Sequence, residues 1–552
     1  MIPKRGADFL VEAFEKQGIT TVFTLSGNHI MPIFDALIGR DIQLIHTRHE
    51  ASTVHMADCW ARLKHEVGIA MVTGGPGHAN AVSALYTALM AESPVVLLSG
   101  HAPNTQIGRG AFQEMRQAEM CAPVCKASWT CAGPEFLAAD FKLACAIALS
   151  GRPGPVHLSL PSDALEDSSQ KTQSTIASPD APSLNVLKVK EPSAAVCESI
   201  TAALQSAKRP LILCGPSGAH TFSAELALLE NALHIPTIAM ESPRGLADPS
   251  LGSFSEVIEQ ADVILLLNKR SDFTMKFLSA PPFAKNVSFI QLDSDLDEIE
   301  RTKIAAQNRL PLSVQADLLP SINGLLQAVS EKKSTSHNES AWYDFVKSAV
   351  RYRPAEWATL KSLQDNVVHP VNALLPLQVI LDSHPDSVLV SDGGEIGQWA
   401  QACLHAPNRI LNGVAGSIGS SLPFAIAAAL AKKDVPVVAV LGDGTFGFHS
   451  SEIDTAVRYQ APFLAVIGND ACWNAEYQIQ VREYGTARAL GCELLPSTRY
   501  DQVCMAFGGV GELVNTHDQV LPAALRLHHA KLPACLNILI EGAPAPNLKR
   551  PS

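Results

Sequence analysis

Short apolar runs alternate with longer amphipathic segments along the whole of this 552-residue chain. The apolar runs are rich in Val, Ile and Leu and lack strict alternation with polar residues, which is typical of parallel strands covered on both faces. The clearest runs are 20–25, 68–73, 95–99, 155–160, 211–214, 263–267, 388–390, 436–441 and 463–467. This pattern predicts an α/β fold built from doubly wound parallel sheets.

Two stretches interrupt the alternation. Residues 166–193 are rich in Ser, Thr, Gln, Lys and Pro, and residues 330–340 (SEKKSTSHNES) are equally polar and poor in apolar side chains. Such a composition is typical of interdomain linkers. The sequence therefore predicts three doubly wound α/β domains, at residues 1–165, 190–328 and 345–545.

Composition narrows the classes of partner. The chain has 54 acidic and 42 basic residues, a net charge of −12, so it lacks the basic surplus of a nucleic-acid-binding protein. Its longest apolar stretch, 422–431, is too short to span a bilayer. The N-terminal segment predicts an amphipathic helix without the apolar core of a signal peptide. We expect a cytoplasmic protein that acts on a small molecule and binds neither nucleic acid nor membrane.

The twelve cysteines are scattered, and none forms a Cys-x-x-Cys pair. Cys121, Cys125 and Cys131 form the densest group, but no second ligand pair or histidine lies near them in the sequence. That spacing argues against a zinc site. The simplest interpretation is a set of buried, reduced thiols.

The strongest chemical signal is the segment 437–469, VVAVLGDGTFGFHSSEIDTAVRYQAPFLAVIGN. One strand ends in Gly442-Asp443-Gly444-Thr445, a helix follows, and a second strand ends in Asn469-Asp470. Parallel sheets bind ligands at this carboxyl edge, where glycines allow a diphosphate to approach the backbone. Asp and Asn oxygens beside a diphosphate suit Mg²⁺. The alternative is a strand-ending turn, in which Asp-Gly pairs are common.

These residues resemble the signature of the thiamine-diphosphate (ThDP)-dependent enzymes, in which GDG is followed some two dozen residues later by an asparagine pair. Gly468 replaces the first asparagine here, and Asn469 keeps the second. The resemblance implies ThDP and Mg²⁺ as cofactors. The residues that it assigns to the metal are Asp443, Asn469 and the backbone carbonyl of Ala471, and those that it assigns to the diphosphate are Gly442, Gly444 and Thr445.

A second signal is the segment 45–50 (IHTRHE), which ends a strand and opens a helix. A glutamate at a helix start also has a purely structural explanation, because it is stabilised by the helix dipole. The resemblance implies that Glu50 hydrogen-bonds the aminopyrimidine of the cofactor and helps to deprotonate the thiazolium carbon. The family builds each site from the first domain of one subunit and the third domain of another. A homodimer is therefore the expected minimum, and a homotetramer the expected assembly.

Other cofactor contacts follow from the same resemblance. They are Gly74, Pro76, Asn80, Gly394, Glu395, Gly416, Ile418 and Trp473. Ile418 occupies the place of the large apolar residue that holds the cofactor bent, whereas Glu395 departs from the neutral donors expected there. In the second domain, the turn 215–218 (GPSG) lies where some relatives bind FAD or ADP. A single glycine-rich turn is weak evidence, so we expect no FAD.

Two features favour a carbon–carbon lyase or carboligase. Segment 27–30 (GNHI) resembles benzaldehyde lyase and 2-hydroxyacyl-CoA lyase-like proteins, which implies that His29 relays protons at the substrate oxygen. Gln113, in Phe-Gln-Glu, matches a glutamine near the reacting carbon in several branches. Structural alternatives are a satisfied core histidine and a glutamine that serves backbone groups. Segment 470–485 is expected to cover the site.

The sequence thus predicts an enzyme that acts on 2-hydroxy ketones or 2-hydroxyacyl thioesters. The first alternative is an acetolactate synthase-type or other 2-oxo acid decarboxylase. Against acetolactate synthesis, the arginine and tryptophan expected near Thr274 and Gln478 are missing, although Trp473 and Arg482 lie close to the second position. Pyruvate decarboxylases have adjacent histidines where this chain has only His101. The second alternative is an inactive regulatory paralogue.

Overall fold

The computed structural model describes residues 4–168, 173–331 and 340–550. The chain forms two compact units. The first comprises the described residues of Met1–Leu187, Ser362–Gly397 and His405–Ala543, and the second those of Lys188–Lys361, Gln398–Leu404 and Pro544–Ser552. Parts of both predicted linkers, 169–172 and 332–339, lie outside the described residues.

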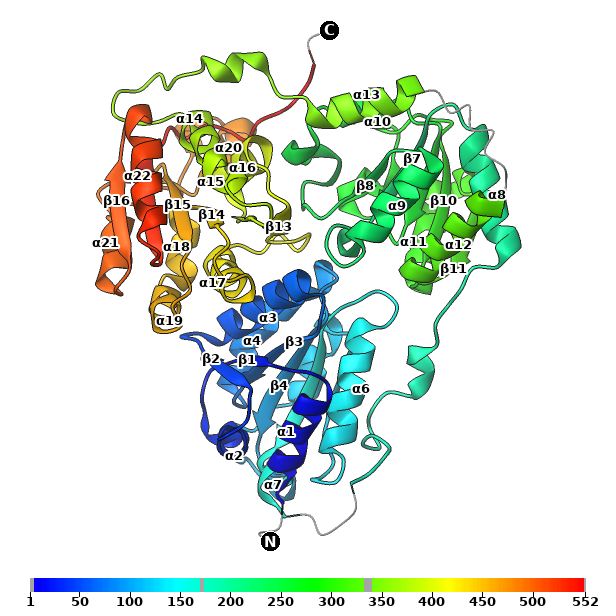
Figure 1. Ribbon diagram of the computed structural model, residues 1–552, viewed down its shortest axis with the longest axis vertical. Helices are drawn as coiled ribbons and strands as arrows, with labels where there is room; N and C mark the ends of the chain where they lie inside the picture. The colour runs from blue at the N-terminus through cyan, green and yellow to red at the C-terminus, as the bar shows by residue number, and fades with distance from the viewer. Residues whose placement is uncertain (1–3, 169–172, 332–339, 551–552) are drawn as a thin grey trace. The chain divides into compact units, whose positions relative to one another are not determined.

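The first sheet of unit one has six parallel strands in the order β2-β1-β3-β4-β6-β5 (Figure 1). Its strands are β1 (Thr21–Thr24), β2 (Gln43–His46), β3 (Gly68–Val72), β4 (Val95–His101), β5 (Ala127–Thr130) and β6 (Val156–Pro161). Its helices are α1 (Gly6–Lys16), α2 (Met31–Ala36), α3 (Glu50–Lys64), α4 (Pro76–Met90), α5 (Gln117–Cys121), α6 (Leu137–Leu149) and α7 (Ser162–Glu166).

The second sheet of this unit repeats the same order, β13-β12-β14-β15-β17-β16, again with all strands parallel. Its strands are β12 (Val388–Ser391), β13 (Asn408–Leu411), β14 (Val437–Gly442), β15 (Leu464–Asn469), β16 (Val510–Val514) and β17 (Ala534–Leu539). The helices are α14 (Pro370–Leu374), α15 (Gln378–Asp382), α16 (Gly394–Cys403), α17 (Ser421–Ala431), α18 (Asp443–His449), α19 (Glu452–Arg458), α20 (Asn474–Tyr484), α21 (Tyr500–Ala506) and α22 (His517–His529). The residues of α16 from Gln398 onward belong to unit two.

Unit two contains a five-stranded parallel sheet in the order β11-β10-β9-β7-β8. Its strands are β7 (Pro210–Cys214), β8 (Thr237–Ala239), β9 (Val263–Leu267), β10 (Ser288–Asp293) and β11 (Leu312–Gln315). Its helices are α8 (Ala194–Ser206), α9 (Ser223–Leu233), α10 (Ser255–Ile258), α11 (Leu296–Ala306), α12 (Leu318–Glu331) and α13 (Ser340–Arg351).

All nine apolar runs singled out in the sequence form strands, and the predicted fold class of three parallel-sheet α/β domains is confirmed. β3 shows why these strands lack alternation. Ile69 and Met71 pack into the core beside α1 and α6, whereas Ala70 and Val72 pack into the core beside α3 and α4. Both faces of the strand are therefore buried, and each position requires an apolar side chain. No helix in the described ranges is long and apolar enough to cross a membrane.

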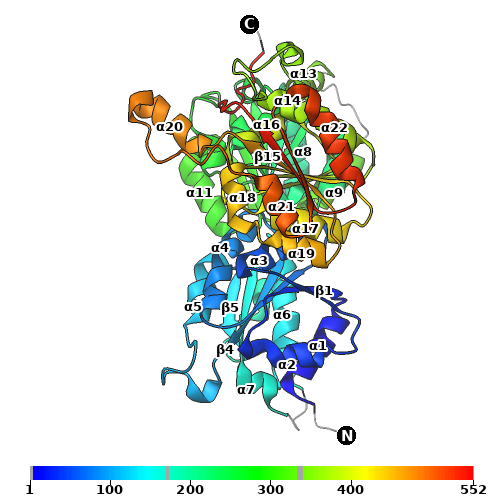
Figure 2. The same ribbon diagram turned by 90° about the vertical axis from the view of Figure 1, so that its left-hand side faces the viewer.

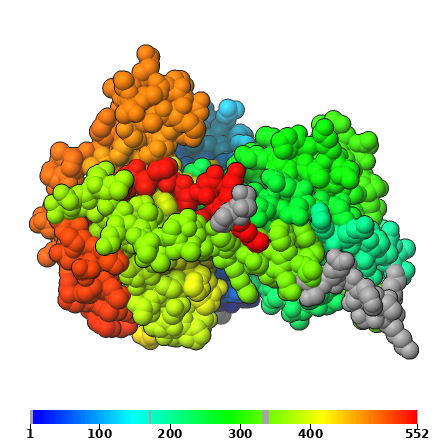
Figure 3. Space-filling view, turned by 90° about the horizontal axis from the view of Figure 1, so that it is seen from above, coloured from blue at the N-terminus to red at the C-terminus, as the bar shows by residue number. Residues whose placement is uncertain are grey.

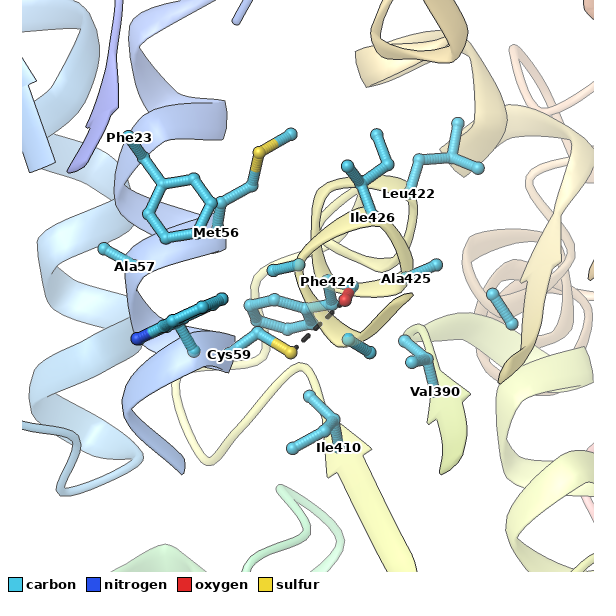
Figure 4. Packing of buried hydrophobic residues seen from close by; sticks show 14 of the residues in the cluster. Phe23, Met56, Ala57, Cys59, Val390, Ile410, Leu422, Phe424, Ala425 and Ile426 are labelled. Atoms are coloured by element: carbon cyan, nitrogen blue, oxygen red, sulfur yellow. Dashed lines mark hydrogen bonds between the residues drawn. The ribbon is translucent and has the colours of Figure 1, made fainter. Parts of the chain in front are cut away.

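The two sheets of unit one share a hydrophobic core, in which α3 packs against α17 (Figure 4). Met56, Ala57 and Cys59 of α3 belong to the same buried cluster as Phe424 and Ala425 of α17. The Cys59 thiol donates a hydrogen bond to the Phe424 carbonyl oxygen at 3.2 Å. Glu50 begins α3, and the loop that carries Ile418 leads directly into α17. The packing of α3 against α17 therefore anchors the helices to which both residues are attached.

Candidate functional site

A pocket opens at the carboxyl edge of the second sheet of unit one, where β12 and β14 lie side by side. It is the point at which the strand order of the sheet changes direction, the usual ligand site of doubly wound sheets. Every lining residue comes from 393–476: Gly393, Gly394, Glu395, Ile396, Ile418, Gly442, Asp443, Gly444, Thr445, Gly468, Asp470, Cys472, Trp473, Asn474, Ala475 and Glu476. Eight of the predicted cofactor or metal residues are thus brought together; Gly416, Asn469 and Ala471 are outside the lining.

Asp443 is one of the acidic residues that line this pocket. It starts α18, and its Oδ1 accepts the Gly444 N–H at 2.8 Å. Its Oδ2 is buried and has no hydrogen-bond partner among the residues that the structure describes. Burial raises the pKa of Asp443 to about 6 against several opposing backbone N–H groups. A buried carboxylate oxygen without a partner is costly, and a cation would satisfy it.

Asp470 adds a second carboxylate to which the sequence assigned no role. Burial and, after it, the charge of Asp443 raise the pKa of Asp470 to about 8, with a further contribution from Glu395. Three acidic groups therefore repel one another in one pocket, which favours a bound cation. Trp473 and Thr445 also line the pocket. The Trp473 ring packs closely against Gly444, where a Cβ would lie 2.6 Å from it, and Thr445 Oγ1 donates to the Gly442 carbonyl at 2.9 Å.

The other two predicted metal ligands lie at the end of β15. Asn469 is buried; its Oδ1 accepts the Ala471 N–H at 3.2 Å, and its amide donates to Asn537 Oδ1 at 3.2 Å. Ala471 adopts a positive φ of 55°, and its carbonyl accepts the Leu494 N–H at 2.7 Å. Each of these two oxygens retains one lone pair, since a carbonyl or amide oxygen accepts two hydrogen bonds.

Asp392, another residue without a role in the sequence analysis, connects the loops around the pocket. Its fully buried carboxylate accepts N–H groups from Gly393 at 2.7 Å, Gly419 at 3.0 Å and Ser421 at 3.1 Å. Ile418 lies next to this junction, because a Cβ at Gly393 would be 2.8 Å from Ile418 Cγ2. Asp392 thus fixes the position of Ile418 relative to β12.

We expect Asp392→Asn to raise the cofactor concentration needed for half-maximal activity by about 10- to 100-fold, because an amide cannot accept all of these N–H groups. The kcat at saturating cofactor should change little. Activity titrations with cofactor measure both quantities. Asp386→Asn, on the exposed turn before β12, is the matched control. A variant whose kcat falls while its cofactor affinity is unchanged would contradict this positioning role.

The segment predicted to cover the site does so only at its start. Asn474–Glu476 line the pocket, whereas the rest of α20 projects from its unit in Figures 2 and 3. Arg482, which lies close in the sequence to the position of the missing tryptophan, is exposed and pairs with Glu483. Gln478 donates to Asn474 Oδ1 at 3.0 Å and so serves the start of its own helix.

The first sheet carries a second polar group at its carboxyl edge, centred on Glu50. Glu50 opens α3, and its Oε2 accepts a hydrogen bond from Asn80 Nδ2 at 3.0 Å. Gly77 permits a close approach: a Cβ there would lie 3.3 Å from Glu50 Oε1 and 2.8 Å from Thr73 Cγ2. The segment before Glu50 is held by Glu452, whose buried carboxylate accepts the N–H groups of residues 48 and 49 at 2.9 and 3.0 Å.

His29 and Gln113 belong to the same group. His29 is buried, its Nδ1 lies 3.1 Å from Thr73 Oγ1, and its ring stacks on Phe112. Burial lowers the pKa of His29, so the imidazole is neutral at physiological pH. Gln113 adopts a positive φ of 57° and lies against Gly75, where a Cβ would be 2.7 Å from its own Cβ.

Gly74 and Pro76 complete the predicted residues at this edge. A Cβ at Gly74 would lie 2.6 Å from the Gly100 carbonyl oxygen, so the turn requires glycine, and Pro76 is the exposed first residue of α4. The structure therefore forms two groups of predicted residues, one at the carboxyl edge of each sheet of unit one. Glu50 is not among the residues that line the pocket beside Asp443.

Comparison with known proteins shows which family has domains like these. Residues 4–120 match the N-terminal TPP-binding domain of thiamine pyrophosphate enzymes, residues 197–317 the central domain and residues 392–538 the C-terminal TPP-binding domain. The acetolactate synthase large subunit of Mycobacterium tuberculosis is 30% identical over 547 residues, covering 96% of this chain and 95% of the relative. This chain belongs to the thiamine pyrophosphate enzymes.

Other relatives carry different activities. The 2-hydroxyacyl-CoA lyase 2 of Caenorhabditis elegans is 28% identical over 587 residues, covering 97% of this chain and 90% of the relative. Oxalyl-CoA decarboxylase of Escherichia coli K12 is 27% identical over 555 residues, covering 98% of this chain and 95% of the relative. Family membership shows that the protein is an enzyme that uses ThDP as its cofactor. It does not distinguish among the different reactions of these relatives.

The residues present fit that cofactor. Glu50 and Asn80 offer a carboxylate and an amide at the edge matched to the N-terminal TPP-binding domain. The unpartnered Asp443 oxygen and the glycine-lined pocket lie at the edge matched to the C-terminal one. When bound, ThDP supplies a carbon nucleophile and an electron sink for cleavage beside a carbonyl group.

Proposed function

We propose that this chain is a Mg²⁺-dependent carbon–carbon lyase or carboligase acting on 2-hydroxy ketones or 2-hydroxyacyl thioesters. The observation that carries the proposal is the neutral, buried His29 near the Glu50 group: Thr73 contacts His29, and both Thr73 and Glu50 lie against Gly77. A lyase must remove the proton from a substrate hydroxyl group before the adjacent bond breaks. A neutral imidazole is suited to that task.

The chain's residues divide the work. Glu50, held by Asn80, would exchange a proton with the aminopyrimidine of bound ThDP, and His29 would take the substrate hydroxyl proton. Gln113 orients the substrate oxygen. Asp443, Asn469 and the Ala471 carbonyl are the proposed ligands of Mg²⁺, which would neutralise the diphosphate and the local acidic charge. Ile418, Trp473, Thr445 and the glycines of the pocket would position the cofactor.

His29→Asn is expected to lower kcat/KM for carbon–carbon cleavage by about 100-fold, because the substrate hydroxyl loses its base. The rate of hydrogen–deuterium exchange at the reactive cofactor carbon, which depends on Glu50, should not change. Since burial lowers the His29 pKa, wild-type activity should stay constant above the ordinary histidine value and fall at more acidic pH. His405→Gln, an exposed histidine, is the control. Equal loss of exchange and cleavage would exclude the proposed role.

A second copy of the chain would complete each site. Glu50 is half-buried and Asn80 exposed in the single chain, whereas proton exchange with the cofactor requires exclusion of water. We propose a homodimer as the minimum active unit and a homotetramer as the assembly, with the first domain of one copy facing the third domain of the other.

Mixing subunits tests this arrangement. Glu50→Gln and Asp443→Asn homodimers should both be inactive, and co-expression of the two chains should restore activity. Each mixed dimer would contain one site with both native residues and one site with neither. If Glu50 and Asp443 of the same chain formed the site, mixed dimers would stay inactive.

A 2-oxo acid decarboxylase of the acetolactate synthase type is the second candidate, favoured by the 30% identity to an acetolactate synthase over nearly the whole chain. Incubation with an acyloin, a 2-hydroxyacyl thioester and pyruvate separates the two. Aldehyde release from the first two substrates supports the lyase, whereas CO₂ release from pyruvate supports the decarboxylase. An inactive paralogue would turn over none of them, and it would bind no ThDP in the presence of Mg²⁺.

A further inference from the structure

A buried cluster of metal-binding side chains lies in the first domain, outside the site described above. His78 of α4, Cys121 of α5 and His157 of β6 each offer one ligand atom, and these atoms all lie within 4.8 Å of one another. His78 Nε2 and Cys121 Sγ are 3.5 Å apart. All three side chains are fully buried. The cluster could not be predicted from the sequence, because the two histidines lie 43 and 36 residues from the cysteine and contact it only in the folded chain.

Each histidine is oriented by a serine on its other ring nitrogen. His78 Nδ1 lies 2.8 Å from Ser99 Oγ, and His157 Nδ1 lies 2.8 Å from Ser128 Oγ. Ser128 donates its hydroxyl hydrogen to the Ala118 carbonyl at 2.8 Å, so it accepts from His157 Nδ1. His157 therefore carries its proton on Nδ1 and presents a bare lone pair at Nε2. Such second contacts are typical of histidines that bind metals.

That lone pair has no counterpart among the described residues. His157 Nε2 is buried and accepts no hydrogen bond there. Burial and the neighbouring His78 hold the pKa of His157 well below its ordinary value, so a proton does not fill the position. A buried acceptor without a donor is unfavourable unless a cation or water occupies the space beside it.

Cys121 supplies the sulfur ligand. Its fully buried Sγ lies 3.5 Å from His78 Nε2. Thiolate sulfur and imidazole nitrogen are the donors that zinc prefers over oxygen-binding Mg²⁺. Bond lengths of about 2.0–2.3 Å put neighbouring ligand atoms of a tetrahedral zinc roughly 3.3–3.8 Å apart, so the present spacing of at most 4.8 Å needs to contract by about 1.5 Å or less.

We propose that His78, Cys121 and His157 bind a Zn²⁺ ion as its three protein ligands. The ion would connect α4, α5 and β6 directly beneath the turn that shapes the cofactor edge. Gln117, one helical turn before Cys121, already links these parts: it accepts the Gly75 N–H at 2.9 Å and donates to the Gly100 carbonyl at 3.1 Å. An effect of zinc on cofactor binding rests on the proposed function, whereas the metal site itself does not.

Metal analysis of the full-length protein, purified without chelators, tests the proposal. We expect about one equivalent of zinc per chain by mass spectrometry. Replacement of zinc by Co²⁺ should give the strong visible bands of a tetrahedral site and a thiolate-to-metal charge-transfer band. Cys121→Ser and His157→Gln should lose both, and Cys145→Ser, a buried thiol on α6 of the same domain, should keep them. Asp443→Asn should also keep them, which separates this metal from the one at the cofactor pocket.

The wild-type Co²⁺ spectrum keeps the test decisive even if the cluster variants fail to fold. Wild-type protein with no zinc and no thiolate charge-transfer band would overturn the proposal. So would a disulfide between Cys121 and Cys125, shown by the loss of two titratable thiols, or a charge-transfer band that persists in Cys121→Ser.

Discussion

The Glu50→Gln variant is expected to lose about three orders of magnitude in kcat while it still binds ThDP. The amide keeps the size of the side chain and can still meet Asn80, but it cannot exchange a proton with a ring nitrogen. Steady-state kinetics with the preferred substrate give kcat, and equilibrium dialysis of radiolabelled ThDP with Mg²⁺ gives the cofactor affinity. Exchange of hydrogen for deuterium at the reactive cofactor carbon should slow by the same factor as kcat.

Glu119→Gln is the matched control for that experiment. Glu119 is exposed on α5 of the same domain, so its replacement removes the same charge without touching the Glu50 group. Near-normal kcat in Glu50→Gln would remove Glu50 from the mechanism. If that variant lost ThDP binding while its kcat per bound cofactor stayed intact, the role of Glu50 would be to hold the cofactor and not to exchange a proton with it.

The strands of this protein could be predicted because both of their faces are buried, so that nearly every position carries an apolar side chain. Residues on both faces of β3, β7 and β14 are apolar, and such runs are visible without knowledge of the partners. The order of the strands could not be predicted in the same way. The two sheets of unit one share one strand order and the sheet of unit two has another, yet the apolar runs of all three look alike. Strand order depends on how connections cross a sheet, which periodicity does not encode.

The shared core of unit one was missed for a similar reason. Sequence composition separates three domains at polar stretches, whereas α3 and α17 pack together across more than 350 residues of intervening chain. Contacts at such separation leave no local pattern. Glu452 is a functional consequence of this packing, because its carboxylate holds the backbone just before Glu50. A glutamate at the first position of a short helix gives no sign of that role in the sequence.

The residues of the candidate site likewise divide into those that the sequence could predict and those that it could not. Residues inside recognisable motifs, such as Asp443 and Glu50, could be placed at sheet edges from the strands they follow. Asp392 and Asp470 also follow strands, but their importance arises from burial and from neighbours that the sequence does not reveal. The histidines beside Cys121 are the extreme case, since three elements must pack before the cluster exists.

Asp443→Asn should stabilise the metal-free protein and abolish its stabilisation by ThDP and Mg²⁺. Burial raises the pKa of Asp443 from 3.8 to about 6, and burial with the nearby charge raises that of Asp470 to about 8. The native metal-free state thus binds these protons more tightly than the unfolded chain does. Its stability is greatest below pH 3.8 and declines as pH rises through 6 and 8, because the carboxylates must then be charged in the fold.

An asparagine at position 443 removes one charge and relieves its repulsion of Asp470. At pH 8 in EDTA we expect the free energy of unfolding to rise by about 2 kcal/mol, seen as a higher Tm in thermal denaturation. The gain should vanish near pH 4, where the native carboxyl group is protonated. When Mg²⁺ and ThDP are added, wild-type Tm should rise and the variant's Tm should not, because the proposed metal loses its only charged ligand.

Asp470→Asn distinguishes charge relief from metal binding. It removes the same repulsion from the opposite side, so its metal-free Tm should also rise at pH 8. Since Asp470 is not among the proposed ligands, the cofactor-dependent rise in Tm should survive in this variant. If Asp443→Asn kept that rise while Asp470→Asn lost it, Asp470 would replace Asp443 as the anionic metal ligand. The GDG motif would then act through its glycines and backbone N–H groups alone.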